Sequence, residues 1–138
     1  MRNFILSIFF VISIGAGLEL ILLDHVEDIW QWIPLIVMGI SFPLILAIHF
    51  DWMAGLEKLF AILMYLSAAS AAVGLFFHFK ANFEFEQEMY PALGNVELFL
   101  KSLKGATPSL APGTMLAIGM IGILYLRVYK QEKLSKTL

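Results

Sequence analysis

Glu19 is the residue whose type and position most directly suggest chemistry in this sequence. It lies inside the first long apolar run, shortly before Asp24, the first acidic residue after that run. A carboxyl group within a membrane-crossing helix is costly, by roughly 2.5–3.5 kcal/mol at the bilayer centre, and often marks a binding site or an ion path. The alternative is that Glu19 is protonated, or is hydrogen-bonded to a neighbouring helix near the membrane interface. The sequence leaves both interpretations open.

Four more ionisable residues can join Glu19 at one end of a helical bundle: Asp24, His25, His78 and Glu84. Imidazole and carboxylate groups suit Zn²⁺, Fe or Cu(II), and two facing histidines can hold a haem. An acid-rich mouth also concentrates cations. These five residues therefore form the candidate cation or metal site.

The spacing inside this candidate site is not typical of metal-binding bundles. The sequence contains no His-x₃-His and no Glu-x-x-His pattern. Asp28 and Gln31 match instead a capping box for the helix that follows, which makes His25 a turn residue. We therefore expect no cofactor, with a divalent metal or a haem as the alternative.

A path from Glu19 across the membrane has little polar support. The second and third apolar runs offer four residues for it: Ser41, Tyr65, Ser67 and Ser70. At the other end, Asp51 is interpreted as a helix cap or turn residue and His49 as an interfacial side chain. Tyr125 and Tyr129 are interpreted as part of the aromatic belt that marks the membrane surface.

Composition places the chain in lipid. It has 138 residues, of which 60% are hydrophobic and 14% charged, and a mean hydropathy of +0.84. A soluble domain of this size needs more charge to cover its surface. The net charge of −2 makes nucleic acid an unsuitable partner, and the lack of cysteine excludes disulfides and thiolate chemistry. No phosphate loop, serine elbow or zinc-protease helix is present, so we expect no enzyme.

Four apolar runs predict the elements that must position these residues. They cover residues 4–23, 29–50, 59–79 and 108–126, and each is long enough for a helix to cross a hydrocarbon core of about 30 Å. The first run has some features of a secretory signal, but its apolar character continues to Leu23, so we expect a retained span. The prediction is an all-α polytopic membrane protein, a single domain over 1–138 with an up-down four-helix bundle.

Charge predicts the orientation. With both chain ends in the cytoplasm, the inner face holds six of the nine basic residues: Arg2, Lys58, Arg127, Lys130, Lys133 and Lys136. The outer face then holds most of the acids. The positive-inside rule therefore favours cytoplasmic termini, and we expect a bacterial inner membrane.

The outer segment 80–107 contains an amphipathic pattern. Val96, Phe99, Leu100 and Leu103 follow helical spacing, which predicts a short helix over 95–104 that lies on the outer membrane surface or caps the bundle. Residues 82–89 fit either an extended strand or a continuation of the third helix, and the pattern does not decide between them.

Small residues on the third and fourth runs predict close helix packing: Ala68, Ala72, Gly113, Gly119 and Gly122. With no catalytic motif, the sequence favours a non-enzymatic subunit whose partners are the lipid bilayer and either copies of itself or a larger membrane complex. The alternative is a cation channel, a transporter or a metal-binding protein that uses Glu19 and the outer cluster.

Overall fold

The computed structural model describes residues 1–24, 26–105 and 112–137. The described residues form helices joined by turns: α1 (Arg2–Leu22), α2 (Ile29–His49), α3 (Leu56–Met89), α4 (Asn95–Ser102) and α5 (Gly113–Thr137). In these ranges α1, α2, α3 and α5 are long and apolar enough to cross a membrane. The all-helical prediction is therefore confirmed for the described part of the chain. Residues 108–111, the start of the fourth predicted run, lie outside it.

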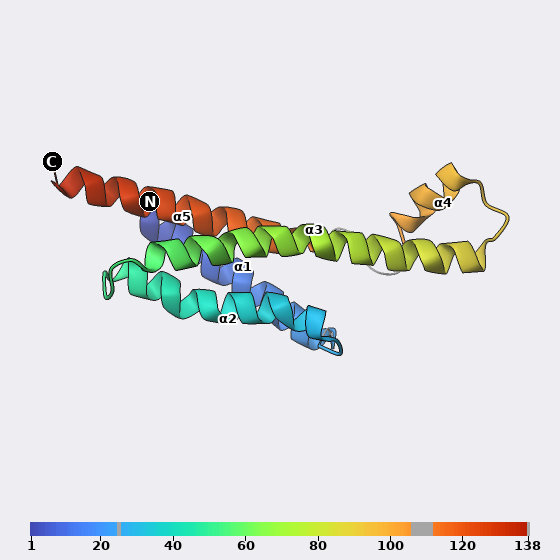
Figure 1. Ribbon diagram of the computed structural model, residues 1–138, viewed down its shortest axis with the longest axis horizontal. Coiled ribbons are helices and arrows are strands. Elements are labelled where there is room, and N and C mark those ends of the chain that lie inside the picture. The colour runs from blue at the N-terminus through green and yellow to red at the C-terminus, as the bar shows by residue number, and fades with distance from the viewer. Residues whose placement is uncertain (25, 106–111, 138) are drawn as a thin grey trace.

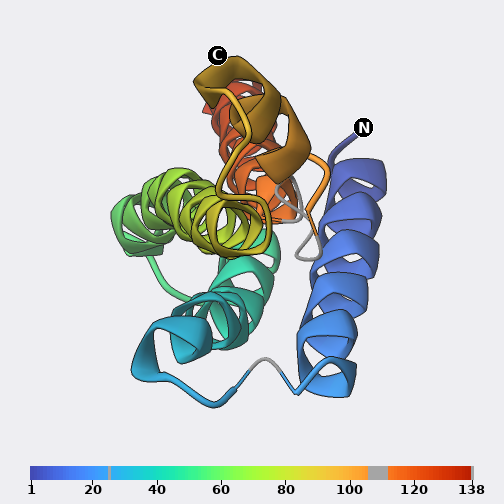
Figure 2. The same ribbon diagram turned by 90° about the vertical axis from the view of Figure 1, so that its right-hand side faces the viewer.

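Successive long helices run in opposite directions along the long axis of the molecule, which is horizontal in Figure 1. Both chain termini lie at one end, here named the terminal end, while α4 lies beyond the other, the α4 end. Around the bundle, α1 neighbours α2, α2 neighbours α3, α3 neighbours α5, and α5 neighbours α1 (Figure 2). The α3–α5 contact is the most extensive and the α1–α2 contact the loosest. Helices α1 and α3 therefore sit on a diagonal.

An aromatic and aliphatic core fills the bundle nearer the terminal end. Phe9 is fully buried, and its ring centroid lies 5.9 Å from that of Phe60 and 6.3 Å from that of Phe42. Ile45 and Met64 are also fully buried. Each long helix is apolar on nearly all sides but buries only one, so many large apolar side chains remain exposed. Helices that are hydrophobic all round are typical of membrane spans.

Helix α3 continues well past its predicted apolar run. It ends at Met89 rather than at residue 79, so residues 82–89 are helical and the extended alternative is wrong. In this polar extension Lys80 Nζ lies 3.5 Å from Glu84 Oε1, an ion pair at i,i+4 spacing that stabilises the helix. An apolar run marks the part of a helix that suits lipid, and polar turns can extend the same helix beyond it.

Helix α4 folds back against this extension. Lys101 Nζ lies 3.1 Å from Glu86 Oε2, and Leu98 and Ser102 are buried. At Gly105, the Asn82 side chain leaves no room for a Cβ atom. The predicted apolar residues Val96, Leu100 and Leu103 remain exposed. Phe99 is half exposed, and its ring centroid lies 5.3 Å from that of Phe79 in α3. Thus α4 packs on α3 through both apolar and polar contacts.

Close packing occurs where α3 meets α5. A Cβ atom at Gly119 would lie 2.6 Å from the Met64 carbonyl oxygen and 3.2 Å from the Ala68 Cβ. A Cβ at Gly122 would overlap the Met64 side chain. The Ser67 hydroxyl donates a hydrogen bond of 2.8 Å to the Met115 carbonyl oxygen across the same contact. The backbones therefore approach closely at these glycines.

The other two predicted packing residues lie elsewhere. Ala72 is exposed on α3. Gly113 is the first residue of α5, and no atom of another described segment would lie within 4 Å of a Cβ there.

Candidate functional site

The predicted outer cluster is spread over separate surfaces. Glu19 is exposed on α1, which lies diagonally across the bundle from α3, the helix that carries His78 and Glu84. Glu84 pairs with Lys80 of its own helix. Among the described residues, no three side chains of the metal-ligating types gather as a metal site. His25 lies outside the described residues.

The turn before α2 has the local structure that its sequence predicts. The Gln31 side-chain oxygen accepts hydrogen bonds from the backbone N–H groups of Glu27, at 2.7 Å, and Asp28, at 3.2 Å. Trp32 Nε1 donates to the Val26 carbonyl oxygen at 3.0 Å. Asp28 and Gln31 thus form the predicted capping box. Asp24, in the preceding turn, has a φ of 50°.

The terminal end holds a polar network that the sequence reasoning missed. The Tyr129 hydroxyl donates a hydrogen bond of 2.6 Å to Asp51 Oδ1 and accepts one of 3.1 Å from Lys133 Nζ. Lys133 Nζ also lies 3.8 Å from Asp51 Oδ1. One turn further into the bundle, the fully buried Tyr125 hydroxyl lies 2.9 Å from His49 Nδ1. These five residues are named here the terminal network.

The geometry of α5 and of the α2–α3 turn explains this network. Tyr125, Tyr129 and Lys133 follow each other at spacings of four, so they share one face of α5. Asp51 has a φ of 53°, a left-handed conformation that aspartate tolerates better than most residues. The sequence did contain a signal, namely this spacing of four together with Asp51 in the opposite turn.

Electrostatics keep Asp51 charged. The hydrogen bond from Tyr129 has the largest effect and lowers the pKa of Asp51 below its ordinary value. Burial raises this pKa by less than the hydrogen bond lowers it, and the positive charges of Lys133, Arg2 and Lys136 lower it further. Arg2 of α1 lies 3.6 Å from Glu132 of α5, which links α1 to the same end. The hydrogen bonds and the ion pair of the terminal network therefore connect the C-terminal end of α2 to α5.

Among the described residues, two of the grooves lie between neighbouring long helices. One, between α1 and α2, has a volume of about 240 Å³ and an almost wholly apolar lining that includes Ser13, Gly17 and Met38. The other, between α3 and α5, has about 170 Å³ and mixes apolar with polar residues. It is lined by Ala61, Tyr65, Ile123, Leu126, Arg127 and Lys130. This second groove is named here the α3–α5 groove.

Comparison of the chain with protein-family models, with curated proteins and with solved structures finds no match.

Proposed function

We propose that this chain is a non-enzymatic integral membrane protein that acts as an oligomeric or accessory subunit of a membrane complex. In this proposal α1, α2, α5 and the apolar part of α3 cross the bilayer as an up-down bundle. The terminal end, which carries most of the basic residues, faces the cytoplasm, as the positive-inside rule favours. The membrane is a bacterial inner membrane.

The observation that carries the proposal is the position of Glu19 on the outside of the bundle. A pore or internal ion site needs its carboxylate to face the other helices, whereas Glu19 is exposed on α1. By helix rise it lies about 5 Å below the end of α1 at Leu22. A carboxyl group facing lipid there is disfavoured, and a neighbouring polypeptide can satisfy it with a hydrogen bond.

The surface around Glu19 suits helix contact. Asn3, Ser7, Gly15 and Glu19 are all exposed and are spaced at multiples of four along α1. Rows of this spacing form the ridges that pack when two helices cross. Among the described residues, no atom beyond the neighbouring backbone of α1 would lie within 4 Å of a Cβ at Gly15, so another backbone can approach there. We name this row the α1 ridge and assign the assembly contact to it.

The α4 end supplies a second surface for a partner. Helix α3 has 34 residues and a length of about 50 Å, against about 30 Å for the hydrocarbon core. Its last turns and α4 therefore stand outside the bilayer in the proposed orientation. The exposed apolar side of α4 suits the outer membrane surface or another subunit.

Cysteine cross-linking in native membranes tests the assembly contact. The chain has no cysteine, so Gly15→Cys introduces a unique thiol on the α1 ridge. Ala72→Cys is the matched control, because Ala72 is exposed on α3 at a similar depth, about 10 Å below the end of the apolar run. We expect a thiol-reactive cross-linker to join Gly15→Cys, but not Ala72→Cys, to a second copy or a partner. Equal yields for the two variants would contradict the proposal.

A cation-handling role is the second candidate, favoured by the acidic residues at the α4 end. Glu19→Gln separates the two functions. Loss of cation flux in liposomes with cross-linking unchanged would establish the second candidate. The subunit role predicts no such flux in either protein, and a lower cross-linking yield in the variant, because the amide cannot replace every hydrogen bond of the carboxyl group.

A further inference from the structure

We propose that the α3–α5 groove binds an anionic phospholipid, with the phosphate at Arg127 and Lys130 and part of an acyl chain along the apolar floor. The inference rests on the membrane placement in the proposed function but not on assembly. The first observation that supports it is that the groove has both polar and apolar lining residues. Arg127, Lys130 and the Tyr65 hydroxyl provide polar contacts, and Ala61, Ile123 and Leu126 provide apolar ones.

The depth of the two cations matches the lipid headgroup layer. Gly122 packs at the level of Phe60 and Met64. Arg127 lies about 7 Å further toward the terminal end by helix rise, which is the level where α3 begins at Leu56. The cations therefore lie at the membrane surface and the apolar floor runs from them into the span. A phospholipid has the same arrangement, with its charged headgroup at the membrane surface and its acyl chains in the hydrocarbon core.

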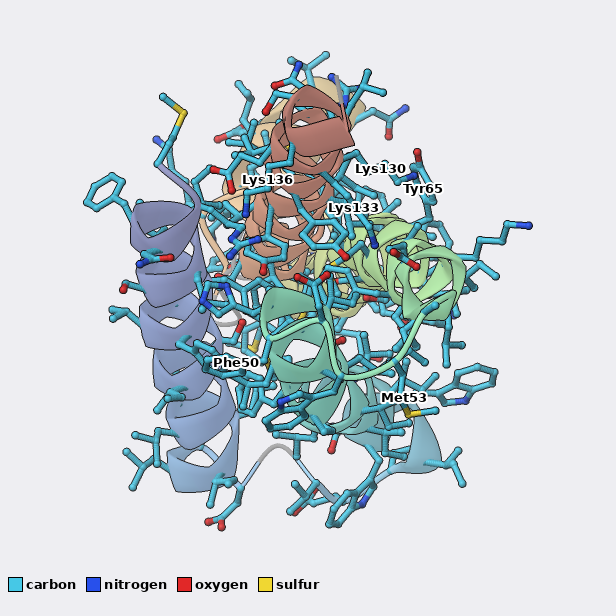
Figure 3. The ribbon with its side chains drawn as sticks, turned by 90° about the vertical axis from the view of Figure 1, so that its left-hand side faces the viewer. Phe50, Met53, Tyr65, Lys130, Lys133 and Lys136 are labelled. Carbon is cyan, nitrogen blue, oxygen red and sulfur yellow. The ribbon has the colours of Figure 1, made fainter. Side chains whose placement is uncertain are left out.

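Side-chain direction brings the polar groups together. Side chains tilt toward the N-terminus of their helix. Helices α3 and α5 are antiparallel (Figure 1). By this tilt, Tyr65 leans toward the terminal end, while Arg127 and Lys130 lean along the helix axis toward the α4 end. Figure 3 shows Tyr65 and Lys130 next to each other along the line where the two helices meet.

Charge balance also favours an anion here. The basic residues Arg2 and Lys133 at the same end pair with Glu132 and Asp51. Within the described part of the chain, Arg127 and Lys130 have no ion-pair partner, and both are exposed. Basic pockets between membrane helices on the cytoplasmic side are suited to anionic headgroups. A soluble anion would use the cations but leave the apolar floor empty.

Native mass spectrometry of the delipidated protein in neutral detergent tests the site. Phosphatidylglycerol and phosphatidylcholine with identical chains are the probes. We expect the wild-type protein to bind phosphatidylglycerol more tightly. The double variant Arg127→Gln/Lys130→Gln should lose roughly 30-fold in affinity for it, about fivefold for each cation. Filling the floor with Ala61→Phe should also weaken binding, although both cations remain.

The matched control is Lys58→Gln/Lys136→Gln, which removes two exposed charges from the same end without touching the groove. It should bind phosphatidylglycerol like the wild-type protein, and all variants must keep wild-type helicity. Equal losses in the two double variants, or equal affinity for the two lipids, would overturn the proposal. So would displacement of the lipid by glycerol phosphate at similar concentration, because that result assigns the site to a soluble anion.

Failure of this site and failure of the proposed function are distinguishable. Lipid selectivity is measured on the isolated chain, whereas assembly is measured by cross-linking through the α1 ridge. A protein that cross-links at Gly15→Cys but does not distinguish the two lipids refutes the lipid site alone.

Discussion

Asp51 illustrates what single residues contribute at the terminal end. Its left-handed backbone, with a φ of 53°, places the carboxylate where Tyr129 and Lys133 of α5 reach it. The partners are 78 and 82 positions away in the chain, so this turn residue holds the end of α2 to α5. Its charge state therefore bears on how firmly the bundle closes at that end.

The stability of the protein should depend on pH through Asp51. The hydrogen bond from Tyr129 and the nearby positive charges lower the pKa of this carboxyl below 3.8 in the folded protein. The stabilisation is therefore fully present well above pH 3.8 and is lost as the pH falls through the lowered pKa. NMR titration of the Asp51 carboxyl should show the low value, and Tyr129→Phe should raise it. An unchanged pKa in that variant would show that the hydrogen bond does not cause the shift.

At the scale of elements, the contact between α3 and α5 is the most extensive in the bundle. Gly119 permits it, because the Met64 carbonyl oxygen occupies the space that a side chain there would need. Without a hydrophobic drive between helices in lipid, such close contact supplies dispersion energy and short hydrogen bonds. The bond from Ser67 to Met115 is one of these.

Gly119→Ala should therefore destabilise the bundle by about 1–3 kcal/mol, because the added Cβ meets backbone that cannot move aside easily. Gly39→Ala in α2 is the matched control, since no other segment in the described part of the chain comes within 4 Å of a Cβ there. It should be neutral or stabilising by up to about 1 kcal/mol, because alanine favours the helix. Unfolding of both variants in a denaturing detergent, followed by circular dichroism, measures the difference. Equal stabilities would contradict the assigned packing.

For the whole molecule, the arrangement of helices fixes which groups share an end. Both termini, the α2–α3 turn and the terminal network lie at one end, and α4 with the extension of α3 lies at the other (Figure 1). Whichever way the bundle crosses a membrane, all the groups of the terminal end therefore face one side, and α4 with the extension of α3 faces the other. The asymmetry of basic residues favours the terminal set inside.

Thiol labelling of intact cells tests this orientation. Ser102 is fully buried against α3, so the exposed Lys104 is the suitable position at the α4 end. We expect Lys104→Cys to react with a membrane-impermeant maleimide from outside. Ser135→Cys, exposed near the C-terminus, should react only after the cells are opened. The reverse pattern would place the terminal end outside.

The number and type of the long elements could be predicted from the sequence. A run of about 20 apolar residues suits a helix across a bilayer, since only helices satisfy their backbone groups internally at that length without a barrel. The capping box at Asp28 and Gln31 was also predictable, because its partners are close in the chain. The polar end of α3 was left open, since apolar content alone says nothing about where a helix ends in water.

Only the tertiary structure decided which side each helix presents to its neighbours. In helices that are apolar nearly all round, the sequence carries little signal for rotation about the helix axis. It could not show that Glu19 faces outward, that Tyr129 reaches Asp51, or that Tyr65 lines the same groove as Arg127 and Lys130. These relations depend on contacts between residues far apart in the chain, and those contacts set the rotation and depth of each helix in the bundle.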